Sequence, residues 1–210
     1  MTQEIQTALT KLKNCEGKLT DLIKEMSIGL VIKPIDIYSM AIVNRSLALI
    51  NGFEVMLISN NYHGAVHLVR LHLDSLLRYA ALWMVADSNA FIRAVMTGVC
   101  VSSLTDKNGR KMTDKHLKEV VAADYPWVEN VYEQTSGFVH FSHKHIAFST
   151  KVTNEQAHEV QHAIRREDTF VEDESRLEAI EEMVAISDCI ADYLGWWIIS
   201  KNDQPKPSEE

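Results

Sequence analysis

The chain has 210 residues but only 8 Gly and 4 Pro, the two residues that most often interrupt regular structure. Because 46% of it is hydrophobic, this scarcity excludes loop-rich and disordered classes and favours a helical protein with a sizeable core. Its three cysteines, Cys15, Cys100 and Cys189, are far apart, which is typical of free thiols in a reducing compartment. There is no CxxC motif and no Cys/His zinc spacing, so the sequence predicts no cofactor.

Positive charge is also scarce, since the formal net charge is -8. Neutralising phosphates needs a surplus of Lys and Arg, so the composition argues against nucleic acid or an anionic membrane as a general partner. The N-terminal residues lack the apolar core of a secretory signal, and we find no apolar run of the roughly 18 to 20 residues that span a membrane. We expect a cytoplasmic protein with one helical domain over residues 1–200 and a disordered tail over 201–210.

A seven-residue repeat marks the first expected helix, from Thr2 to about Gly29. Such a seam fits either a coiled coil that forms a homodimer or a bundle helix packed within its own chain. Gly17 and the small side chains in the seam favour the bundle, although a homo-oligomer, most simply a dimer, remains the expected partner. The repeat consists of Ile5, Leu12, Leu19 and Met26, with Ala8, Cys15, Leu22 and Gly29 three positions later.

Two strongly apolar segments predict a helical hairpin at the centre of an all-α, antiparallel bundle. The first runs from Ile37 to Ser59, with Asp36 as its expected N-cap and apolar residues on nearly all sides. Asn60 and Asn61 interrupt it, and a long helix over residues 62–86 follows at once. The short connection makes the two helices antiparallel neighbours.

The end of the chain predicts one more long helix. Ser175 and Glu178 form a capping box at its start, and apolar residues follow along one side. The opposite side carries Glu181, Glu182, Asp188 and Asp192, which we expect to face solvent.

The segment near residues 145–165 supports two interpretations. Alternating apolar residues, Ile146 to Val152 and His158 to Ile164, predict a small β-hairpin that turns near Asn154. The capping box of Thr153 and Gln156 instead predicts a helix. We favour the hairpin, as an insertion in the bundle.

Two helices carry the polar residues that predict a site. His63, His67, Arg70 and Asp74 share one face of the long helix, and Tyr132, Ser136 and His140 share one face of another. If these faces pack together, an anion-recognising pocket results, in which Arg70 binds a small-molecule anion and His140 acts as an acid or base. The alternative is a closed network without a ligand, in which Arg70 pairs with Asp74 and Tyr132 and His140 satisfy the remaining groups.

A metal site is a further alternative. His63 and His67, four residues apart on a helix, can both reach one ion, and His143 or His145 would complete the site. The inner helices carry no Glu-x-x-His pair of the di-iron type, which weakens this prediction.

The motifs R-x3-D (Arg70, Asp74) and Y-x3-S-x3-H (Tyr132, Ser136, His140) resemble those of small uncharacterised bacterial helical proteins, over about residues 40–145. Those families usually place Glu where this chain has Asp74. Some are similar to HEPN-type helical domains, many of which are ribonucleases in bacterial conflict and phage defence. HEPN nucleases need Arg followed four to six residues later by His on one helix, and no helix expected here carries that pair. The resemblance implies a bacterial protein associated with defence, or a HEPN-like relative that has lost or altered its active motif.

Overall fold

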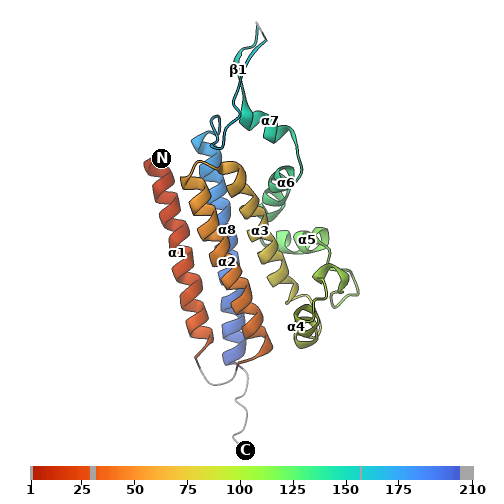
Figure 1. Cartoon of the computed structure of the whole chain (residues 1–210). Helices are drawn as coiled ribbons and strands as arrows, with labels where there is room; N and C mark the ends of the chain where they lie inside the picture. Colours follow the sequence, from red (N-terminus) through yellow and green to blue (C-terminus); the bar gives the residue numbers. More distant parts are fainter. Residues whose placement is uncertain (1, 29–31, 157, 204–210) are drawn as a thin grey trace, which may run out of the picture.

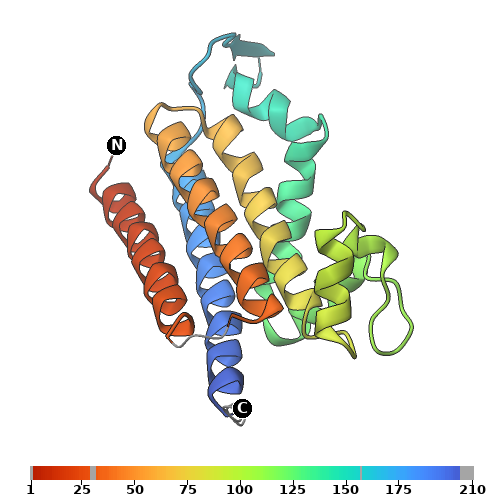
Figure 2. The ribbon, with the colours of Figure 1, turned by 60° about the horizontal axis from the view of Figure 1, so that its bottom comes forward.

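Eight α-helices, a short 3-10 helix and one β-hairpin make up the described chain. The structure is a computed structural model that describes residues 2–28, 32–156 and 158–203. Helices α1, α2, α3 and α8 lie side by side as a bundle, α5 and α6 pack on one side of α3, and α4 packs on α2 (Figures 1 and 2). The elements are α1 (Gln3–Met26), α2 (Pro34–Ile58), α3 (Tyr62–Ala81), α4 (Ser88–Met96), η1 (Val101–Ser103), α5 (Asp114–Asp124), α6 (Trp127–Val139), α7 (His143–Ser149), β1 (Thr150–Asn154), β2 (Glu159–His162) and α8 (Asp173–Asn202).

The heptad seam of α1 is buried inside the chain's own bundle. Ile5, Leu12, Leu19 and Met26 are each at most 2% exposed, and α1 packs mainly on α8. The bundle interpretation of this helix is therefore confirmed, because the seam is already covered and is not free to form a coiled coil with a second chain. Gly29, the last residue of the predicted seam, lies outside the described residues.

Helix α2 begins three residues earlier than predicted. Lys33 is its N-cap and Pro34 occupies the first helical turn, where the missing N–H of proline costs nothing. Asp36 is therefore the third helical residue and not the N-cap, and its carboxylate accepts the backbone N–H of Lys33 at 2.8 Å.

Asp36 also ties α2 to the end of α8. Its carboxylate accepts the Trp197 indole N–H at 2.7 Å and the Lys201 ammonium at 2.8 Å. The same ammonium donates to the carbonyl of Met26, the last residue of α1. Lys201 and Asn202 thus belong to α8, which corrects the tail predicted to begin at residue 201; residues 204–210 lie outside the described residues.

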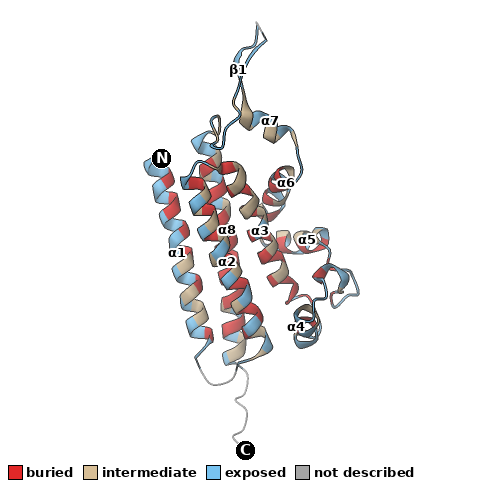
Figure 3. Ribbon diagram, viewed as in Figure 1, coloured by how far each residue is buried: buried red, intermediate tan, exposed pale blue. Residues whose placement is uncertain are grey.

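The predicted helical hairpin of α2 and α3 is present, but α3 is its central member. Asn60 adopts a positive φ of 55° at the turn, and the Asn61 side chain caps α3 by accepting the N–H of Gly64 at 2.9 Å. Helix α3 packs on α2, α5, α6 and α8 and ends at Ala81 instead of Ala86. Helix α2, expected to be buried all round, exposes one whole face (Figure 3).

The β-hairpin is confirmed, and the helix that a capping box predicted there is absent. β1 pairs antiparallel with β2, with Val152 opposite Val160. Residues before Thr150 form α7, so the hairpin is shorter than the predicted insertion. It projects beyond the end of the bundle (Figure 1), and nearly all its residues are exposed.

Two of the bundle helices, α2 and α8, have the length and hydropathy of a membrane-crossing helix by composition alone. The sequence alone predicted no membrane-spanning run. Core helices of soluble proteins share these properties, and α8 is largely buried in the bundle.

Candidate functional site

Arg70 and Asp74 share one face of α3, as predicted, but they do not pair with each other. Asp74 binds Arg45 of α2 at 3.1 Å and Arg78, one turn along α3, at 2.9 Å. Arg70 instead approaches Asp114 of α5 at 3.6 Å, and Arg78 binds the same carboxylate. These five residues form one charge network that links α2, α3 and α5. The predicted Arg70 to Asp74 pair is wrong because both groups find closer partners on neighbouring helices.

Tyr132 is the only member of the second predicted face that meets this network among the described residues. The guanidinium of Arg70 lies 4.1 Å from the centroid of the Tyr132 ring, a cation–π contact. One terminal nitrogen of Arg70 and one of Arg78 are buried without a hydrogen-bond partner. The network therefore contains three arginines and two aspartates and leaves two donors unsatisfied, and none of its five residues lines the cavity between α3, α6, α7 and α8 that is described below.

Ser136 and His140 do not reach Arg70. The Ser136 hydroxyl donates to the carbonyl of Tyr132 within α6 at 2.7 Å. Helix α6 ends at Val139, and His140 follows with extended backbone and an exposed side chain. The predicted pocket of Arg70, Asp74, Ser136 and His140 is therefore not assembled, because the helix ends before His140 can turn inward.

We accordingly expect His140→Ala to change the free energy of unfolding by less than about 0.5 kcal/mol, as for other exposed positions. Urea denaturation followed by circular dichroism measures this. A loss above about 1.5 kcal/mol would show that His140 makes an interior contact in solution.

The histidines proposed for a metal are only partly brought together. The rings of His63 and His145 lie 4.6 Å apart, and His67 bonds the carbonyl of His63 through Nδ1 at 2.6 Å. Burial, followed by the nearby His145, lowers the pKa of His63. His143 lines a different space on the far side of α7. Among the described residues, no three His, Cys, Asp or Glu side chains lie close enough to hold a metal ion.

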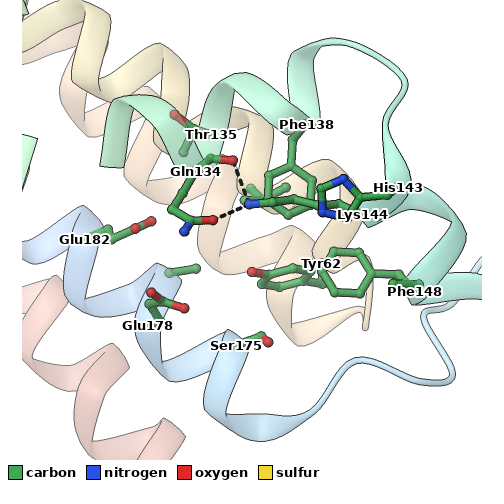
Figure 4. A pocket seen from close by; sticks show the side chains of 13 residues that line it. Tyr62, Gln134, Thr135, Phe138, His143, Lys144, Phe148, Ser175, Glu178 and Glu182 are labelled. Carbon is green, nitrogen blue, oxygen red and sulfur yellow. Dashed lines mark hydrogen bonds between the residues drawn. The ribbon is translucent and has the colours of Figure 1, made fainter. Parts of the chain in front are cut away.

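A cavity of about 280 Å³ lies between α3, α6, α7 and α8 (Figure 4). Helix α7 closes it by folding back against α6, where the Ser142 hydroxyl donates to the carbonyl of Gly137 at 2.6 Å. Three aromatic rings form one wall: Phe138 and Phe148 stack at 5.5 Å, and Tyr62 meets Phe148 edge-on at 5.3 Å. These rings give the cavity an apolar patch, beside which α6 and α7 also contribute Gln134, Thr135, His143 and Lys144.

Its opposite wall, on α8, is acidic. Glu178 and Glu182 are one helical turn apart and their carboxylates point into the cavity (Figure 4). Burial and, to a smaller extent, the nearby Glu178 raise the pKa of Glu182 to about 7, while Lys144 acts in the opposite direction. The prediction that Glu182 faces solvent is therefore wrong, because α6 and α7 cover this part of α8.

The hydroxyl of Tyr62 points toward the two carboxylates. Tyr62 is only 5% exposed, and within the described part of the chain its hydroxyl has no hydrogen-bond partner (Figure 4). Burial raises its pKa, with smaller contributions from Glu182 and Glu178. A neutral hydroxyl can donate or accept, so the cavity offers one free phenol beside two carboxylates.

Lys144 is the cation of the cavity, but its ammonium is already bound elsewhere. It donates to the carbonyl of Gln134 at 3.0 Å and to that residue's side-chain oxygen, and it lies 4.7 Å from the Phe138 ring centroid. Burial lowers the pKa of Lys144, although Glu178 and Glu182 act in the opposite direction. Within the described residues, no hydrogen-bond donor reaches the Glu182 carboxylate. The acidic wall therefore lacks a matching cation.

The sequence held only one signal for this cavity. Glu178 and Glu182 are four residues apart, which places them on one face of a helix. Nothing in the pattern showed that α7 would cover that face, since the fold-back depends on the cap at Ser142, three residues after α6 ends. Tyr62 and Lys144 were missed for the same reason.

Comparison with known proteins adds no assignment: no family model matches the chain, and neither a curated protein nor a solved structure shows significant similarity. The HEPN-like relationship thus stays a prediction. Arg110 and His116 are six residues apart, but Arg110 lies in the loop before α5 and His116 inside it. His116 bonds Asp106 at 2.9 Å. Function must therefore be argued from the cavity itself.

Proposed function

We propose that this protein binds a small organic cation, an ammonium group on a short apolar body, in the cavity of Figure 4. The observation that carries the proposal is the acidic wall of Glu178 and Glu182, which faces a partly open cavity beside the free Tyr62 hydroxyl. Glu182 is half-buried and Glu178 is exposed, and a carboxylate that is partly withdrawn from water favours a paired cation. The volume of about 280 Å³ is near the lower limit of known ligand sites, so the ligand is small.

The two walls suit the two ends of such a ligand. An ammonium group has three donors, which match the carboxylates of Glu178 and Glu182 and the Tyr62 oxygen. The rings of Phe138 and Phe148 cover the apolar body of the ligand. This proposal replaces the anion site predicted at Arg70, whose guanidinium lies in the charge network and does not line this cavity.

Three molecules of similar size test the charge preference: n-butylammonium, n-butanol and butyrate. We expect n-butylammonium alone to bind, with a dissociation constant of about a millimolar because so small a ligand gains little energy. Chemical shift changes in 1H–15N spectra, followed by titration, measure this. Equal responses to the alcohol and the ammonium, or preferential binding of butyrate, would refute the proposal.

Glu182→Gln should weaken n-butylammonium binding about tenfold, since it removes one charge-assisted hydrogen bond. Glu181→Gln is the matched control, because Glu181 is the neighbouring residue on the exposed side of α8. Both variants lose one negative charge, so general electrostatic attraction changes equally. Equal weakening by both would place the binding outside the cavity.

Binding should also strengthen as the pH rises through about 7. Below its pKa of about 7 Glu182 is protonated, and a cationic ligand must displace that proton. The gain approaches tenfold per pH unit below this pKa and disappears above it. Isothermal titration in buffers of different ionisation enthalpy would detect the released proton. The Glu182→Gln variant should show no such dependence.

The raised pKa of Glu182 also predicts how the stability of the ligand-free protein depends on pH. Because the folded-state pKa of Glu182 is raised, the unfolded state loses its proton first, and stability falls as the pH rises from about 4.5 to 7. We expect Glu182→Gln to increase the free energy of unfolding by about 1 kcal/mol at pH 8, a value reduced for partial solvent screening. At pH 4 the variant and the parent should be equal. Urea unfolding at the two pH values measures this, and a destabilised variant at pH 8 would contradict it.

A further inference from the structure

One face of α2 is exposed along the whole helix, and its residues recur with alternating spacings of four and three. This outer stripe consists of Ile37, Ala41, Asn44, Ala48, Asn51, Val55 and Ile58. Its large members are well exposed, at 47% for Ile37, 58% for Val55 and 53% for Ile58. The spacing is that of a coiled-coil seam, yet no described element of this chain covers it.

None of the seven residues of the outer stripe is charged, and the charged residues of the same segment, Arg45 and Glu54, lie beside it. The exposed face of α1 gives the comparison within the same bundle, since it carries Lys11, Lys13, Lys18, Asp21 and Lys24. A helix face that is meant for water normally shows such charges. The outer stripe therefore has the composition of a covered surface.

We infer that a second copy of this chain covers the outer stripe, with the two α2 helices antiparallel around a twofold axis near Ala48. A twofold interface brings a surface against itself, so the surface must be self-complementary. The stripe meets this condition because its order is nearly the same from either end. Ile37 then faces the Ile58 end of the second copy, and Asn44 lies beside Asn51, whose amide can both donate and accept.

The dimensions are sufficient for such a dimer. The stripe is about 33 Å long at 1.5 Å per residue. If the grooves between α2 and its neighbouring helices are included, the stripe is about 20 Å wide. Its area is then roughly 650 Å² per copy, near the 800 Å² that each partner buries in a standard interface. Leu71 of α3, 43% exposed, widens the apolar area beside the centre of the stripe. Ala41 and Ala48 allow the two backbones to approach closely.

Light scattering of the full chain tests the inference. We expect a mass about twice the 23.8 kDa of one chain at concentrations of about 100 µM, above the micromolar dissociation constant of a modest interface. Ala48→Glu with Val55→Glu should give a monomer, because it buries like charges at the centre of the interface. Thr10→Glu, on the exposed face of α1, is the control and should leave the dimer intact. Circular dichroism verifies that each variant is folded.

Disulfide trapping locates the contact independently. The exposed Cys100 is first replaced by Ser, and Ala48→Cys is then oxidised. We expect covalent dimer to form about tenfold faster than with Asn14→Cys on α1, because the interface raises the effective concentration of the thiols. A mixture of Asn44→Cys and Asn51→Cys should cross-link more than either alone.

Three outcomes would overturn the inference. A parent protein that stays at the mass of one chain has no such dimer. A dimer that survives Ala48→Glu with Val55→Glu, without cross-linking at Ala48→Cys, uses another face. Binding of the parent, but not of that double variant, to neutral phosphatidylcholine vesicles would assign the outer stripe to a lipid surface.

Discussion

Replacing Asp36 by Ala is expected to lower the free energy of unfolding by about 3 to 5 kcal/mol, the usual cost of breaking a buried ion pair on one side. Asp36 is 1% exposed and holds both the Trp197 indole and the Lys201 ammonium. Its loss leaves a poorly hydrated ammonium and an unsatisfied indole N–H at the meeting point of α1, α2 and α8. Urea denaturation followed by circular dichroism measures the change.

Two variants control this experiment. Asp21→Ala removes an exposed carboxylate that pairs only with Lys24, three residues along α1, and should cost less than about 0.5 kcal/mol. Asp36→Asn keeps an acceptor for Trp197 and should fall between the two. A cost of Asp36→Ala no larger than that of Asp21→Ala would mean that the ends of α2 and α8 are not joined as described.

Asp74→Ala is expected to cost about 2 to 4 kcal/mol, because Asp74 is the only carboxylate of the charge network that contacts Arg45 in the described structure. Without it, Arg45 loses its carboxylate partner in the charge network, and only Arg70 and Arg78 share Asp114. Like charges then face one another across α2 and α3, and the partly buried Arg78 loses one of its two ion pairs. Chemical denaturation at low and at high salt measures the loss, which should be smaller at high salt.

The double variant Asp74→Ala with Arg78→Leu tests whether surplus positive charge causes the loss of stability. It removes one surplus cation together with the carboxylate, so it should recover at least half of the stability that Asp74→Ala loses. Further destabilisation in the double variant, equal to the sum of the single changes, would show that the two residues do not interact.

Much of the fold followed from local patterns. The repeat in α1 predicted both the helix and its buried face, since Ile5 and Leu12 meet the core by periodicity alone. Alternating residues predicted the hairpin, with Val152 opposite Val160. The start of α2 was misplaced because proline occurs both in the first turn of a helix and just after the end of one. Pro34 therefore did not mark the start of α2 by itself. Its burial was overestimated because hydropathy does not distinguish a core face from the outer stripe.

The site was much harder to predict, because its residues come from four helices. Arg70 was correctly placed on an inward face, but its partners Asp114 and Tyr132 come from α5 and α6, and pairing across helices is set by packing and not by spacing. The prediction that His140 lies on the inward face of a helix was wrong for a local reason. His140 lies one residue beyond the end of α6, where the helical periodicity no longer applies. Glu182 was predicted to face solvent because its side of the helix is acidic. In the structure this side is covered by α7, which is only seven residues long.

The packing of α1 on α8 also has a consequence during synthesis. Helix α8 leaves the ribosome after every other described helix, and 146 residues separate Met26 from Asp173. At 5 to 20 residues per second, the apolar seam of α1 waits roughly 7 to 30 seconds for its main partner. During that time α2 is the only other described helix against which α1 packs to an appreciable extent. The nascent chain therefore carries an incompletely covered apolar helix until α8 has been synthesised.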